Sequence, residues 1–416
     1  KKNLMIVSYT FPPSRDVGGR RWSKFIHYLK DLDYNISLLT RKPKEEKKLV
    51  KAHKYLHRVE FFKDRYPKAL EKEPKNIWDR LIYKASILFL MLITKSNYYD
   101  KGILIKRHFI KKASILILEE NINLIIVSGA PFSLLYYSTF LKKKFSIKLV
   151  SDFRDPWTWG SGYGMTLLTK ARLKKEEFFQ KKVIEVSDLI TVPVKPMHDF
   201  LVSNYIDHKF KIKILPHGYD INDFEKINFK KRKRNEIFKI VYGGTIYSNL
   251  DKTFKMMYQT IKDNHHNFFE IEFFTNDIKY LNKSEIEQVS SKLKIRKKLP
   301  ISDFMLKLYF ADAFLLLFPD DVKDFISSKF YEIIYLRKPI IYVGSKGLVS
   351  EFIVSNKLGI HILPEMLRVS FDEILKKGSI ENFNYNYEFD VSEFSFKFLT
   401  SKLNKWIIEL SNNNEK

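Results

Sequence analysis

The chain has 416 residues, of which 45% are hydrophobic and none is cysteine. This length and composition can supply more than one hydrophobic core, and the lack of cysteine excludes disulfides and thiolate metal ligands. Lys and Arg number 74 against 48 Asp and Glu, which gives a formal net charge of +26 at pH 7. Such a charge favours nucleic acid, anionic lipid or phosphorylated substrates as partners, although a solvated lysine-rich surface explains it equally well.

The first half of the chain alternates short apolar runs with helical patterns. Strands are predicted at residues 4–8, 36–40, 124–128, 147–151 and 189–193. The helix after the first strand carries Trp22, Phe25, Ile26 and Leu29 on one face. This alternation predicts a parallel sheet that is covered by helices.

The stretch 45–110 is less regular and is interpreted as an insertion in the first domain. Its most apolar run, 87–94, is far shorter than the roughly 20 residues that cross a bilayer. We expect this run to form a buried helix, and the alternative is a segment that dips into a membrane interface. Residues 1–10 lack the apolar segment of a cleavable signal peptide. A cytoplasmic protein is therefore expected, with peripheral contact at the inner face of the membrane as its only membrane association.

A second series follows a turn at 216–220, with strands predicted at 238–242, 271–274, 313–317 and 339–343. Two such series predict an α/β fold of two facing Rossmann-like domains, with a ligand cleft at the carboxyl ends of their strands. The predicted domains cover 1–200 and 201–390. The remainder, 391–416, is an amphipathic helix that is expected to pack back on the first domain. The basic run 230–234 is interpreted as an exposed loop.

A loop rich in glycine and arginine links the first predicted strand to the first helix. Its sequence is Phe11-Pro-Pro-Ser-Arg-Asp-Val-Gly-Gly-Arg-Arg21. Gly18 and Gly19 allow the backbone to approach a ligand closely, and the N-terminus of the following helix attracts anions. Arg20, together with Arg15 and Arg21, adds donors suited to phosphate. The alternative is that the two glycines only form a tight turn.

The predicted strand at 147–151 leads into Asp152-Phe-Arg-Asp-Pro-Trp157. Strand ends of this kind are where functional residues collect in α/β folds. Asp155 is predicted to orient an attacking hydroxyl, and Arg154 and Trp157 are placed on the same acceptor side. A structural Asp–Arg pair that orders the loop is the equal alternative.

The segment Asp324-Phe-Ile-Ser-Ser-Lys-Phe-Tyr-Glu332 is the most informative one. Backbone amides around Ser327 and Ser328, at a predicted helix start, could hold a diphosphate while Lys329 neutralises its charge. Glu332 could then accept hydrogen bonds from two ribose hydroxyls, with Asp324 placed ahead of the helix. The alternative is a surface loop followed by an ordinary helix.

Five segments in this order resemble the GT-B glycosyltransferases, in particular the large retaining family 4 and its bacterial enzymes of surface-polysaccharide assembly. These segments are 11–20, 152–157, 214–220, 242–247 and 328–339. The resemblance implies transfer of a sugar from a nucleotide-sugar donor to a glycan or lipid-linked acceptor. It also implies retention of configuration and catalysis without an obligatory metal or other cofactor.

The resemblance assigns roles to single residues. The family's pair of glutamates, separated by seven residues, falls on Asp324 and Glu332, so the first position, which contacts the transferred sugar in the family, is one methylene shorter. Glu332 matches the ribose-binding carboxylate. Gly18 and Gly19 match the loop that closes over the donor diphosphate.

Many family members also carry a cationic pair after the first strand of the second domain. That position here falls on the segment 242–247, which contains neither Arg nor Lys. Gly244 and Thr245 are assigned to the donor there. Lys329 is the best substitute for the missing cation, and Lys252 is a poorer one.

Three other classes of protein fit parts of the sequence. A nucleotide-sugar 2-epimerase shares the architecture, and a non-catalytic nucleotide-sugar-binding homologue fits the aspartate at position 324. A nucleic-acid-binding protein fits the charge, but no signature of a nucleic-acid module is present and no such partner is expected. Basic clusters within 101–112 and 142–144, beside apolar residues, favour peripheral contact with an anionic membrane.

Overall fold

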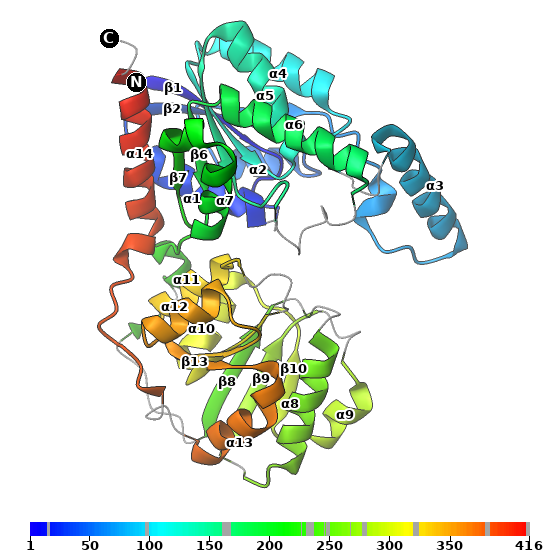
Figure 1. Ribbon diagram of the computed structural model, residues 1–416, viewed down its shortest axis with the longest axis vertical. Helices are drawn as coiled ribbons and strands as arrows, with labels where there is room; N and C mark the ends of the chain where they lie inside the picture. The colour runs from blue at the N-terminus through cyan, green and yellow to red at the C-terminus, as the bar shows by residue number, and fades with distance from the viewer. Residues whose placement is uncertain are drawn as a thin grey trace. The chain divides into compact units, whose positions relative to one another are not determined.

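The computed structural model describes residues 1–14, 17–95, 100–159, 168–225, 227–229, 237–244, 246, 250–266, 268–276, 281–318, 324–378 and 383–412. The chain forms two compact units (Figure 1). Unit 1 contains Lys1–Pro216 together with Phe396–Lys416, and unit 2 contains His217–Ser395. Within the described ranges, none of the helices combines the length and the apolar character needed to span a bilayer.

Unit 1 is built on a seven-stranded sheet in the order β3-β2-β1-β4-β5-β6-β7, and all of its pairings are parallel. The strands are β1 (Lys2–Ser8), β2 (Tyr34–Arg41), β3 (Arg58–Phe62), β4 (Leu124–Gly129), β5 (Lys148–Phe153), β6 (Leu189–Val192) and β7 (Ile212–Ile214). The strand order reverses between β1 and β4, and ligands in such sheets bind at the carboxyl ends of the strands beside this point.

Helices cover the sheet of unit 1, which is why its central strands are continuous apolar runs. These helices are α1 (Val17–Leu29), α2 (Glu46–Ala52), α3 (Ile77–Thr94), α4 (Lys106–Glu119), α5 (Phe132–Phe145), α6 (Lys170–Val186), α7 (Lys195–Asn204) and α14 (Phe396–Asn412). The C-terminal helix α14 packs against α1, where the rings of Phe25 and Phe396 meet edge to face at 5.1 Å. Trp22, Leu399 and Leu403 belong to the same buried cluster.

Unit 2 is a second Rossmann-like unit with a six-stranded parallel sheet in the order β10-β9-β8-β11-β12-β13. Its strands are β8 (Phe238–Gly243), β9 (Phe269–Phe274), β10 (Leu293–Arg296), β11 (Ala313–Leu317), β12 (Ile340–Val343) and β13 (Gly359–Ile362). Its helices are α8 (Asp251–Asp263), α9 (Lys283–Gln288), α10 (Ile301–Phe310), α11 (Ser328–Tyr335), α12 (Leu348–Ser355) and α13 (Leu367–Lys377). The order reverses between β8 and β11, as it does between β1 and β4 in unit 1.

The predicted α/β fold class with two Rossmann-like domains is confirmed, and every strand predicted from the sequence is present. The stretch 45–110 is not wholly an insertion, because residues 46–62 contribute α2 and the sheet strand β3. The basic run 230–234 lies outside the described residues.

Candidate functional site

Two glycines lie in the first turn of helix α1, at the carboxyl edge of the unit 1 sheet. A Cβ atom at Gly19 would lie 2.4 Å from the carbonyl oxygen of Thr10 and 2.8 Å from Cα of Phe11, so the helix starts directly against the backbone after β1. A Cβ atom at Gly18 would lie 1.6 Å from Nη1 of Arg154. The structure therefore brings together two separate motifs, because the end of an arginine side chain lies over the first turn of α1.

Arg154 connects three loops at this edge. Its Nε and Nη2 atoms donate to Oδ2 of Asp155 at 3.0 and 2.7 Å, and Nη2 also donates to the carbonyl of Ala130 at 3.3 Å. Neither bond to Asp155 uses Oδ1. Both side chains are partly exposed, at 15% for Arg154 and 23% for Asp155. The predicted Asp–Arg pair that orders the loop is thus present, and it leaves Asp155 open to solvent.

The other carboxylate of this motif is fully buried. Asp152 accepts hydrogen bonds from Trp22 Nε1 at 2.8 Å, Ser128 Oγ at 3.0 Å and Thr191 Oγ1 at 2.8 Å. Arg21 Nη2 lies 3.4 Å from its Oδ1 atom. These four donors come from α1, β4 and β6, so Asp152 links elements on both sides of β5.

Arg21 is buried as well, which corrects its prediction as a phosphate ligand. Its Nη1 and Nη2 atoms donate to the carbonyls of Pro216 and Leu215 at 2.7 and 2.8 Å. Arg21 is 2% exposed, and these bonds hold α1 to the segment that follows β7. Arg15 lies outside the described residues. Arg20 is partly exposed on the first turn of α1.

Trp157 lies inside unit 1, with 1% of its surface exposed. Its ring stacks on that of Phe132 at 5.0 Å, and its Nε1 donates to Glu176 at 2.8 Å. Burial raises the pKa of the Glu176 carboxyl, and the paired Arg172 opposes that rise. Trp157 therefore supports the loop that carries Arg154 and Asp155, and its ring is not exposed for contact with an acceptor.

A buried acid occupies the start of α5, the helix that follows β4. Asp100 accepts from the backbone N–H of Ser133 at 3.1 Å and from its hydroxyl at 2.6 Å. Burial raises the pKa of this carboxyl despite these bonds. The N-terminus of α5 therefore already holds a carboxylate of the chain itself.

In unit 2, the side chain of Lys329 lies beside the segment 242–247, which has no Arg or Lys of its own. Its Nζ atom donates to the carbonyl of Gly243 at 3.1 Å, at the carboxyl end of β8. A Cβ atom at Gly244 would lie 3.1 Å from the same nitrogen. The Lys329 ammonium thus lies against the two glycines at the carboxyl end of β8. Lys252 is exposed in the first turn of α8, and Thr245 lies outside the described residues.

Helix α11 begins at Ser328, and Ser327 is its N-cap residue without a side-chain capping bond. Glu332 lies one turn further along and is 2% exposed. Asp324 is partly exposed in the turn ahead of the helix. Lys329, Glu332 and the helix start therefore belong to one short element whose N-terminal turn reaches the end of β8.

Lys338 has a different place, although it belongs to the same sequence segment. It is fully buried before β12, and its Nζ donates to the carbonyl of Ala311 at 2.5 Å. Since β12 begins at Ile340, Lys338 lies at the amino end of that strand, away from the carboxyl edge.

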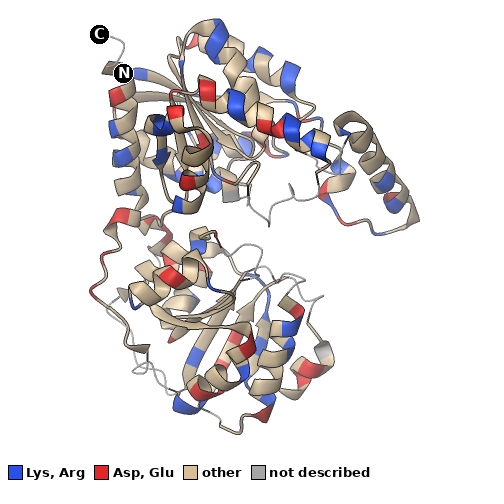
Figure 2. Cartoon of the chain, in the orientation of Figure 1, with Lys and Arg blue, Asp and Glu red and all other residues tan. Residues whose placement is uncertain are grey.

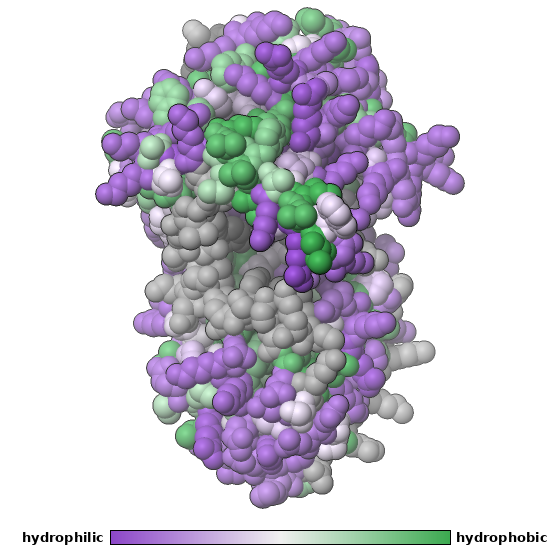
Figure 3. All heavy atoms as spheres, turned by 90° about the vertical axis from the view of Figure 1, so that its right-hand side faces the viewer, coloured by the Kyte–Doolittle hydropathy of each residue, from purple (hydrophilic) through white to green (hydrophobic). Residues whose placement is uncertain are grey.

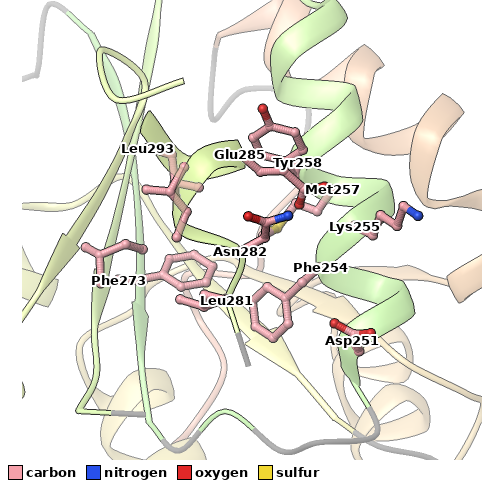
Figure 4. Close-up of a pocket in the computed structure, with 12 residues that line it drawn as sticks. Asp251, Phe254, Lys255, Met257, Tyr258, Phe273, Leu281, Asn282, Glu285 and Leu293 are labelled. Carbon is pink, nitrogen blue, oxygen red and sulfur yellow. The ribbon is translucent and has the colours of Figure 1, made fainter. Parts of the chain in front are cut away.

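A pocket between α8 and α9 is separate from these residues (Figure 4). Phe254, Tyr258, Phe273 and Leu281 line it, and none of its lining residues is a predicted site residue. The described part of the chain contains no group of three or more His, Asp or Glu side chains arranged to hold a metal ion.

No protein-family model matches the chain, and no curated protein matches its sequence. Solved structures match it over nearly its whole length. Sucrose-phosphate synthase from Thermosynechococcus elongatus is 9% identical, with a TM-score of 0.67 over 99% of this chain and 100% of that one. A glycosyltransferase from Rickettsia africae is 14% identical, with a TM-score of 0.63 over 99% of both chains.

The HepE protein of Anabaena, solved in complex with UDP and glucose, is 10% identical, with a TM-score of 0.60 over 98% of this chain and 100% of that one. UDP-N-acetylglucosamine 2-epimerases share the architecture as well. At such identities the likeness shows the fold alone. The chain has the GT-B fold, in which two Rossmann-like domains follow one another.

Proposed function

We propose that the chain is a glycosyltransferase that moves a sugar from a nucleotide-sugar donor to a glycan or lipid-linked acceptor of the cell surface. The observation that carries the proposal is the contact of Lys329 with Gly243 and Gly244 at the carboxyl end of β8. A cation and a helix N-terminus at this strand end suit a nucleoside diphosphate.

Unit 2 would bind the donor. The backbone amides at the start of α11 and the Lys329 ammonium would stabilise the charge that develops on the diphosphate as the bond to the sugar breaks. Glu332 would accept from the two ribose hydroxyls, and Asp324 would contact the transferred sugar. Gly244 allows the diphosphate to approach the backbone after β8.

Unit 1 would bind the acceptor. Asp155, held by Arg154 through Oδ2, has Oδ1 available to orient the attacking hydroxyl. In a retaining reaction the anomeric C–O bond of the donor breaks and the acceptor oxygen bonds the anomeric carbon from the same side. The hydroxyl proton passes to a donor phosphate oxygen, which acts as the base. Gly18 and Arg20, in the first turn of α1, are assigned to binding of the donor diphosphate.

A panel of UDP-, GDP-, ADP- and dTDP-sugars tests donor binding. The matching donor, at a hundredfold excess over its Kd, should stabilise the folded state by about 2.7 kcal/mol and raise its melting temperature. A panel in which no nucleotide-sugar shifts the melting temperature would contradict donor binding. The released nucleotide, measured with and without acceptor, then tests transfer.

A 2-epimerase is the second candidate, because epimerases share this fold. An epimerase needs no acceptor, so an epimerised nucleotide-sugar formed by the chain alone would establish that function instead. Tight donor binding with neither transfer nor epimerisation would identify a non-catalytic homologue.

Substitution of the two glycines of α1 should separate activity from stability. Gly18→Ala displaces only the end of the Arg154 side chain, so we expect turnover to fall by about a hundredfold with little change in melting temperature. Gly19→Ala clashes with the backbone of Thr10 and should cost about 1–3 kcal/mol of stability. Turnover and thermal unfolding of both variants check this. Equal destabilisation of the two variants would contradict the assigned contact.

A further inference from the structure

Helix α3 projects from the body of unit 1 and bears a group of exposed apolar side chains (Figures 1 and 3). Trp78 is 74% exposed and Leu92 is 71% exposed. The exposed members of the group are Ile77, Trp78, Leu81, Ile82, Leu88, Phe89, Met91, Leu92 and Ile93. The expectation that the run within 87–94 forms a buried helix is therefore wrong.

The exposed residues form one face of α3. Positions 78, 81, 82, 85, 88, 89 and 92 follow one another at spacings of one and three, as on one face of a helix, and all of them are apolar and exposed. On the opposite side, Leu90 and Thr94 are buried and Ile87 is half-buried. The outward face of this helix is thus more apolar than a protein surface in contact with water usually is.

The helix is capped at its N-terminus and attached to unit 1 at its C-terminus. At its N-terminus the side chain of Asn76 accepts from the backbone N–H of Asp79 at 2.7 Å. At its C-terminus the carbonyls of Thr94 and Lys95 accept from Arg172 at 3.5 Å and Thr169 at 3.3 Å, at the start of α6. The apolar face is therefore presented by a formed helix that is tied to the rest of unit 1.

Cations lie beside the apolar face. Arg80 and Lys84 are exposed in the first half of α3, and Lys95 follows its last turn. The attached start of α6 adds the exposed Lys170 and Lys174, and Figure 2 shows positive residues along that helix. An apolar helix face with a tryptophan and flanking cations is typical of helices that lie in the surface of an anionic bilayer.

We propose that α3 inserts its exposed face into the surface of an anionic lipid bilayer, where it lies parallel to the membrane plane. Lipid tails would cover the leucines and Phe89, while Arg80 and Lys84 would remain among the head groups. The segment that contains α3 leaves the sheet at the end of β3, the same edge at which the loops with Gly18 and Arg154 begin. Given the proposed function, this edge would face a lipid-linked acceptor.

Flotation of the full chain with vesicles tests the apolar face. Wild-type protein should float with vesicles of phosphatidylglycerol and phosphatidylcholine, and much less with phosphatidylcholine alone. The double variant Leu81→Glu and Leu88→Glu should lower the partition coefficient by about a hundredfold. Leu118→Glu on α4, where Leu118 is 65% exposed, is the matched control and should bind as the wild type does.

A second pair of variants tests the charges. Arg80→Glu with Lys84→Glu should lower binding to the anionic vesicles by about tenfold or more, and Lys405→Glu on α14 should not. The proposal would be overturned if the double leucine variant floated as well as the wild-type protein. It would also be overturned if the wild-type protein bound neutral and anionic vesicles equally. A dimeric wild-type protein together with a monomeric leucine variant would overturn it as well, since a second copy would then cover the face. No sugar donor is present in these measurements, so their outcome is independent of the transferase assay.

Discussion

Replacement of Lys329 by alanine is expected to lower turnover by about a hundred- to a thousandfold, the effect of removing one preorganised donor from a site of developing negative charge. The physical reason is the position of its ammonium, which donates to Gly243 at the end of β8 and lies 3.1 Å from where a Cβ of Gly244 would be. Turnover at saturating donor measures the effect, and thermal unfolding verifies that the fold remains.

Two further substitutions sharpen this test. Lys329→Arg keeps the charge and should recover part of the lost turnover, because a guanidinium also binds phosphate. Lys252→Ala removes an exposed lysine from the first turn of α8 and serves as the matched control, with turnover close to that of the wild type. Wild-type turnover in Lys329→Ala would remove this residue from the mechanism.

Replacement of Asp152 by alanine is expected to destabilise unit 1 by about 3–5 kcal/mol, because it leaves the buried Arg21 without its carboxylate. The donors of Trp22, Ser128 and Thr191 lose their acceptor as well. The free energy of unfolding in urea measures the loss.

The control for this prediction is a change in the same loop. Asp155→Ala breaks an ion pair whose two side chains are partly exposed, and it should cost no more than about 1 kcal/mol. A similar loss of unfolding free energy in both variants would show that the buried bonds of Asp152 do not stabilise unit 1 as expected.

The strands that the sequence failed to predict share one physical property. β3 and β7 are the edges of the unit 1 sheet, and β10 and β13 are the edges of the unit 2 sheet. Central strands are covered on both faces and form continuous apolar runs. Edge strands are partly exposed, as the half-buried residues of β3 show, so no such run marks them in the sequence.

The position of Lys329 was predictable from its motif, because the segment 324–332 was predicted to contain a helix start and α11 begins at Ser328. Lys329 was predicted to replace a missing cation, and its contact with Gly243 supports that role. Arg21 was predicted to bind phosphate and Trp157 was placed on the acceptor side, yet both are buried, because sequence alone does not show which arginine or tryptophan of a loop turns inward. The partner of Arg21 is 131 positions away, at Asp152, and no local pattern connects them.

Helix α3 shows a limit of a different kind. Its run 87–93 is apolar on every side, and such a run has the same hydrophobicity in a core as at a membrane surface. Only the structure shows that Leu88, Phe89 and Leu92 are exposed, at 58%, 49% and 71%. What they contact must therefore be measured.

The most direct test of the account is calorimetric titration of the full chain with the nucleoside diphosphate that corresponds to the best donor. Wild-type protein and the Lys252→Ala control should bind it equally. Lys329→Ala and Glu332→Gln should each weaken binding by about tenfold or more, because the first removes a charged donor and the second replaces a charged two-oxygen acceptor with a neutral amide. Unchanged affinity in both variants, with the fold intact, would contradict a diphosphate site at the start of α11.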